Sequence, residues 1–151
     1  MTIRDTTLRG RASSQGAPEA SPEAQEGAPL DLAHLARQCL GDRDLAAVLL
    51  REFGTQAQRI AAQLAEDDRL SSAAQADIAH RLRGSALAVG ARAVAHAAGV
   101  VEACGRAAAH AAPEAGSRPD EMSQAIATLI EAVSQATAEI ARLQADPPDR
   151  R

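Results

Sequence analysis

Residues 78–86 read Ile78-Ala79-His80-Arg81-Leu82-Arg83-Gly84-Ser85-Ala86. On a helix that turns about 100° per residue, with Ile78 at zero, the side chains that suit a buried stripe fall within about 80° of it. These are Leu82, Ser85, Ala86 and Val89. His80 falls at about 200°, on the opposite side, with Arg83 and Gly84 beside it. The pattern therefore predicts a helix that buries one face and presents a histidine to solvent.

Two further helices are predicted before this one. Asp31 is placed to cap a short helix that carries Leu32, Leu35 and Cys39 and ends at Gly41. Asp42 is placed to begin a longer one, whose apolar side consists of Leu45, Val48, Leu49, Phe53, Ala57, Ile60 and Leu64. Ser72 and Gln75 have capping-box spacing, so Ser72 is predicted to open the helix of His80, which stops around Val89-Gly90.

Two more helices are predicted after His80. One runs from Ala91 to about residue 111, and the last starts near Pro119, a residue suited to a first helical turn. Steps of four and three residues give the last helix a bundle-type seam, formed by Met122, Ile126, Leu129, Val133, Ala136, Ile140 and Leu143. Phe53 is the only aromatic residue, and a composition this poor in strand-forming residues favours helices.

The predicted fold class is therefore all-α: an antiparallel four-helix bundle over residues 29–145, with an additional short N-terminal helix. Residues 1–28 are rich in Gly, Pro, Ser and Glu without periodic large apolar residues, so we expect a disordered N-terminal arm. Residues 146–151 are expected to form a disordered tail.

Charge and hydropathy argue against several classes of function. A net charge of −4 argues against nucleic acid as a partner, and no apolar run is long enough to cross a bilayer. The N-terminus has no apolar signal region, so we expect a cytoplasmic protein. The spacing of Cys39 and Cys104 predicts no metal site, and His34, His96 and His110 are better explained as helix-surface residues than as ligands.

The exposed side of the His80 helix carries the candidate site. Histidine is a nucleophile whose charge is poised near neutral pH, and Arg83 places a cation at i+3 on the same face. Gly84 leaves a notch at i+4. Leu87, at about 180°, is an apolar side chain beside the site, and with Ala76, Arg83 and Gly84 it forms a candidate docking patch. A single exposed leucine is also common on surfaces without a role.

The stretch from His80 to Ala86, followed by the Val89-Gly90-Ala91 turn, resembles the histidine-phosphotransfer (HPt) domains of bacterial phosphorelays. That family has the pattern His-x-Leu-Lys-Gly-Ser/Ala and then a Leu-Gly-Ala turn. The resemblance covers roughly residues 30–143 and departs from the pattern at Arg83, where the family usually has lysine. Arginine keeps the charge and adds a planar fork of donors.

The resemblance implies a phosphocarrier rather than a turnover enzyme, without a kinase catalytic domain. It makes His80 the acceptor of a phosphoryl group from a receiver-domain aspartyl-phosphate, and Arg83 its phosphate support. Glu102, on the following helix, is a candidate hydrogen-bonding residue near the site, and a solvated surface carboxylate explains it equally well. The partners would be receiver domains of response regulators or hybrid histidine kinases. No cofactor is implied, because the Mg²⁺ belongs to the receiver.

Two other functions remain open from the sequence. The same fold could bind a receiver or a kinase without carrying phosphate, and the arginine at position 83 leaves room for this. The bundle could also serve only for oligomerisation through the regular seam of its last helix. The second alternative predicts a stable dimer whose affinity is independent of His80 and Leu87.

Overall fold

The computed structural model describes residues 28–111 and 119–145. These residues form five helices and no strand: α1 (Leu32–Gln38), α2 (Arg43–Glu66), α3 (Ser72–Val89), α4 (Arg92–His110) and α5 (Pro119–Ala145). The all-α prediction is confirmed. The expected disordered arm and tail, residues 1–28 and 146–151, lie outside the described residues except for Ala28.

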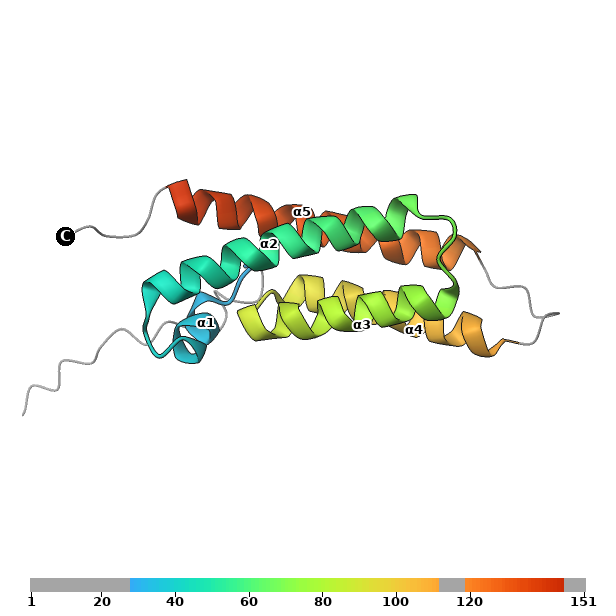
Figure 1. The fold of residues 1–151 in the computed structure, drawn as a ribbon, viewed down its shortest axis with the longest axis horizontal. Helices are drawn as coiled ribbons and strands as arrows, with labels where there is room; N and C mark the ends of the chain where they lie inside the picture. The colour runs from blue at the N-terminus through green and yellow to red at the C-terminus, as the bar shows by residue number, and fades with distance from the viewer. Residues whose placement is uncertain (1–27, 112–118, 146–151) are drawn as a thin grey trace, which may run out of the picture.

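The four long helices form an antiparallel bundle, as the sequence predicts. Neighbours along the chain pack against each other, α2 on α3, α3 on α4 and α4 on α5, and α5 closes the ring against α2. Figure 1 shows α1 across one end of this bundle, near the start of α2 and the turn between α3 and α4. None of the described helices is long and apolar enough to span a membrane.

Helix ends follow the expected capping chemistry with one shift. The Asp42 carboxylate accepts a hydrogen bond from the Leu45 amide at 2.9 Å, and Gly90 ends α3 with a positive φ of 80°. The cap of α3 is Ser71, whose hydroxyl accepts from the Ala74 amide at 3.2 Å. α3 therefore begins at Ser72, as predicted, but the side chain that caps it is that of Ser71 and not that of Ser72.

The core confirms the seam of α5 and corrects the apolar side of α2. Leu129, Val133, Ala136 and Ile140 are all buried in the bundle. On α2, however, Leu45, Val48 and Leu49 are exposed, and Leu50 is buried instead. The buried face of α2 centres on Ala57, and Val48 lies about 180° from it around the helix. No described helix covers that outer face of the first turns of α2.

A buried carboxylate attaches α1 to the bundle. Asp31 is 7% exposed, and its carboxylate accepts from the His34 amide at 2.8 Å and from Arg92 Nη2 at 2.7 Å. Its own amide donates to the Gly90 carbonyl at 2.9 Å. A Cβ at Gly90 would lie 2.8 Å from the Asp31 carbonyl oxygen. The glycine that ends α3 therefore also makes room for the segment that begins α1.

We expect Asp31→Asn to lower the free energy of unfolding by about 1 to 2 kcal/mol at pH 7, because asparagine keeps the cap but loses the ion pair. The His34 amide hydrogen bond lowers the pKa of Asp31 and outweighs burial, with Arg92 adding to the lowering. A lowered folded-state pKa stabilises the fold above the unfolded-state pKa, and that contribution is lost as pH falls through the folded-state pKa. Urea unfolding of both proteins should show the difference shrink below about pH 4. A difference that stays constant down to pH 3 would contradict this assignment.

Candidate functional site

His80 lies in the middle of α3 and points to solvent, as the helical spacing predicts. Its side chain is 64% exposed, whereas Ala79 and Leu82 on the other face are fully buried. The ring is therefore accessible from solvent, on a helix whose opposite face is buried in the core.

Glu102 reaches His80 from α4. One carboxylate oxygen, Oε1, lies 2.9 Å from His80 Nδ1, and the Glu102 side chain is only 16% exposed. Because a carboxylate only accepts hydrogen bonds, Nδ1 carries the proton in this contact. In the neutral ring this leaves Nε2 with its lone pair, and an imidazole nitrogen with a free lone pair is a nucleophile. The contact therefore sets which nitrogen can react.

The charge of Glu102 is maintained by its neighbours. Burial raises the pKa of this carboxyl, but the hydrogen bonds and charges of His80 and then Arg83 outweigh it. The net result is a pKa below the ordinary value of a glutamate. Glu102 is consequently ionised at neutral pH and is a persistent acceptor for the His80 proton.

Arg83 contacts the other oxygen of the same carboxylate. Its Nη1 lies 3.4 Å from Glu102 Oε2, and its side chain is half exposed. The Arg83 side chain lies next to Gly99 of α4, where an added Cβ would be 3.6 Å from Arg83 Nε, an ordinary contact distance. His80 and Arg83 thus share one carboxylate, and Arg83 keeps donors free to face solvent because it has five N–H groups.

Of the other residues predicted for the docking patch, two are exposed and one is buried. Gly84 and Leu87 are exposed, Leu87 by 52%, and a Cβ at Gly84 would meet nothing within 4 Å. Ala76 is fully buried, so its prediction as part of a docking patch was wrong. Its side chain faces α4, where Gly105 lacks a Cβ and lets the two helices approach closely.

Two residues that lie beside the site, Asp77 and Arg106, were not among those predicted from the sequence. Arg106 of α4 places Nη2 3.1 Å from Asp77 Oδ1 and 4.0 Å from Glu102 Oε1. Asp77 precedes His80 by three residues and Arg106 follows Glu102 by four, so each pair shares a helix face. Those spacings are visible in the sequence, but the meeting of the two pairs depends on how α3 and α4 pack.

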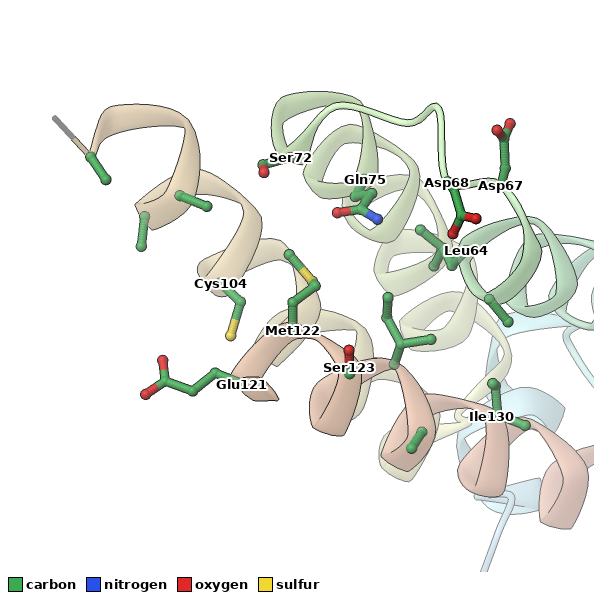
Figure 2. A pocket seen from close by; sticks show the side chains of 16 residues that line it. Leu64, Asp67, Asp68, Ser72, Gln75, Cys104, Glu121, Met122, Ser123 and Ile130 are labelled. Atoms are coloured by element: carbon green, nitrogen blue, oxygen red, sulfur yellow. The ribbon is translucent and has the colours of Figure 1, made fainter. Parts of the chain in front are cut away.

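A hollow in the described part of the chain lies away from His80. It has a volume of about 820 Å³ and is lined by the end of α2, the start of α3, the last turns of α4 and the first turns of α5. Figure 2 shows Asp67, Asp68, Cys104 and Met122 around it. A smaller hollow of about 350 Å³ borders Arg83, between His96 and Val100 of α4.

The surroundings of the other histidines differ from those of His80. His96 and His110 are exposed, and His34 has a buried Nε2 without a hydrogen-bond partner. Within residues 28–111 and 119–145, no three His, Cys, Asp or Glu side chains are grouped closely enough to hold a metal ion.

Comparison with known proteins bears directly on this arrangement. The family model for the Hpt domain matches residues 44–144. This range contains α3 and α4 completely, α2 without its first residue and α5 without its last residue. Neither the curated proteins nor the solved structures contain a match. The match covers more than half of the chain and includes the exposed histidine with its carboxylate and arginine neighbours. The chain therefore belongs to the Hpt domain family, whose members act in histidine phosphotransfer.

Proposed function

We propose that His80 accepts a phosphoryl group from the aspartyl-phosphate of one receiver domain and passes it to another receiver. Hpt domains work with receiver domains in phosphorelays. The observation that carries the proposal is the exposed ring of His80, with Nδ1 2.9 Å from the ionised Glu102. This contact leaves Nε2 as the reactive nitrogen on the accessible side of α3.

In the proposed transfer, the nucleophile belongs to this protein and the leaving group to the receiver. The Nε2 lone pair attacks phosphorus, the P–Nε2 bond forms, and the bond between phosphorus and the receiver's carboxylate oxygen breaks. The aspartate leaves as a carboxylate. The His80 ring becomes positively charged while Nδ1 keeps its proton, and the adjacent Glu102 carboxylate stabilises that charge. The same steps in reverse deliver the group to a second receiver, whose acidic pocket supplies the Mg²⁺.

Arg83 supports the phosphoryl group in this proposal. The transferred group carries its charge on three equatorial oxygens, and a positioned guanidinium offsets it. Arg83 is already held next to the ring by Glu102, at 3.4 Å, and half of its side chain is exposed. It can therefore turn toward the phosphate without leaving the site.

Gly84 and Leu87 fit a docking role for the receiver. A glycine within a helix lowers helix stability by about 1 kcal/mol relative to alanine. Packing within the fold does not require a glycine at position 84, because no atom would lie within 4 Å of a Cβ there. Close approach by a partner accounts for that cost. Leu87, two turns beyond His80 and 52% exposed, adds apolar contact area to the same face.

We expect Glu102→Ala to slow phosphorylation of His80 by about tenfold to a hundredfold, because loss of a residue that orients a reactive ring commonly has an effect of this size. Glu102→Gln should fall between this variant and wild type, since its amide oxygen still accepts from Nδ1 but carries no charge. Rapid-quench phosphotransfer from a labelled receiver measures both rates. Equal rates in all three proteins would show that Glu102 is only a surface carboxylate.

The proposal is tested by incubating the full-length protein with each phosphorylated receiver domain of the same organism. The expected product carries label that is stable in alkali and labile in acid, and peptide mapping places it on His80. Labelled protein should then lose the label to a second, unphosphorylated receiver. Receiver binding without any transfer would favour the phosphate-free binding module instead. If no receiver binds, the receiver-docking part of the proposal fails as well.

A further inference from the structure

A second arginine near His80 is Arg106 of α4, which pairs with Asp77 in the turn of α3 before the histidine. Arg83 follows the histidine by three residues, whereas Asp77, the carboxylate that holds Arg106, precedes it by three. Arg106 Nη2 is 4.0 Å from Glu102 Oε1, the same oxygen atom that lies 2.9 Å from His80 Nδ1. The two guanidinium groups therefore flank the histidine, each beside one oxygen of Glu102.

The charges of this cluster balance before any phosphoryl group arrives. Asp77 and Glu102 contribute the negative charges and Arg83 and Arg106 the positive ones. Asp77 pairs with Arg106, and Glu102 pairs with both arginines and with His80. A phosphoryl group on Nε2 brings negative charge next to Glu102, and like charges this close repel each other. One arginine with half its side chain in solvent offsets only part of that charge.

Arg106 is positioned to supply the rest. Its side chain is 48% exposed, so it can change rotamer, and its partner Asp77 is 64% exposed. An ion pair between two such exposed groups contributes little to stability, so exchanging Asp77 for a doubly charged phosphate is favourable. We propose that Arg106 is a second phosphate-supporting residue, which Asp77 holds beside His80 until the phosphoryl group is in place. This inference rests on the proposed function of His80.

The test uses phosphoramidate in place of a receiver, so that it does not depend on finding the partner. Nε2 of His80 attacks phosphorus, the P–Nε2 bond forms, and the P–N bond of phosphoramidate breaks with release of ammonia. The lifetime of the phosphohistidine is then followed by ³¹P NMR in wild type and in Arg106→Gln. We expect about fivefold faster hydrolysis in the variant, as for loss of one partly screened charge contact. Arg106→Lys should stay close to wild type.

Asp77→Asn separates this mechanism from a general effect of charge. It releases Arg106, so the phosphohistidine should live longer than in wild type, and this gain should disappear in the Asp77→Asn, Arg106→Gln double variant. Arg59→Gln removes an exposed arginine of α2, a helix that carries no member of this cluster, and it should leave the lifetime unchanged. The ¹⁵N spectrum of His80 in unphosphorylated Arg106→Gln should still show Nδ1 protonated, which excludes loss of the Glu102 contact as the cause.

Several outcomes would overturn the inference. These are a wild-type lifetime in Arg106→Gln, an equal gain from Asp77→Asn with and without Arg106, or no phosphohistidine at His80 from phosphoramidate. A protein that phosphoramidate labels on His80 but no receiver labels would contradict the proposed relay function alone. The two proposals can therefore fail separately.

Discussion

Replacement of His80 by glutamine is expected to abolish labelling by every phosphorylated receiver, while the variant folds as well as wild type. Glutamine has no nitrogen that can act as a nucleophile at neutral pH, so the acceptor atom is lost. The fold should be unaffected because the His80 side chain is 64% exposed and the buried side of α3 is untouched. Substitutions at such surface positions usually change stability by less than about 0.5 kcal/mol.

His96→Gln is the matched control for this experiment. His96 is also an exposed helix histidine, one helix away on α4, and borders the small hollow beside Arg83. Its replacement should leave the label on His80 intact. Acid-labile label that persists in His80→Gln would place the acceptor at another histidine, and label lost in both variants would indicate that the two residues act together.

Gly105→Ala is expected to have the largest effect on stability. A Cβ at this position would lie 2.5 Å from the Ser72 carbonyl oxygen and 2.9 Å from the Ala76 Cβ. Neither atom is at the end of a flexible side chain, so α3 and α4 must move apart. Overpacking of this kind costs about 1 to 3 kcal/mol, and here we expect about 2 kcal/mol after the helix propensity of alanine is included. Urea unfolding monitored by circular dichroism measures the loss.

Gly84→Ala is the control, and we expect it to raise stability where Gly105→Ala lowers it. Gly84 is also within a helix, but its surroundings are open, so alanine should stabilise the free protein by up to about 1 kcal/mol. The same variant should transfer phosphate more slowly if a receiver approaches closely there. If both variants were more stable than wild type, the helices would relax easily around a Cβ at position 105. If Gly84→Ala transferred phosphate at the wild-type rate, Gly84 would not be part of the docking surface.

Part of the fold follows from local chemistry that each segment carries by itself. Asp31 and Asp42 each have a backbone amide three residues ahead to cap, and the structure shows both contacts. The seam of α5 is equally local, since the spacing of its apolar residues already defines one face. For the same reason the exposure of His80 could be predicted, because the buried residues around it leave only one direction free.

Other features depend on which neighbour covers a helix face. Ala76 and Leu87 lie close together on the helical wheel of α3, yet Ala76 is fully buried and Leu87 is 52% exposed. Ala76 is buried because Gly105, which has no Cβ, lets α4 approach α3 closely at that point. Leu45 and Val48 are apolar but exposed, because no described helix lies over the outer side of the start of α2.

The sequence by itself determined the helices, most of their capping residues and the outward direction of His80, because these depend on residues within one or two turns of each other. Only the tertiary structure decided that Glu102, Arg83, Arg106 and Asp77 meet around that histidine. Helical spacing determines where a side chain points on its own helix. Which charges of the next helix it meets depends on the separation and register of the two helices, and in this bundle small residues such as Ala76 and Gly105 set that approach.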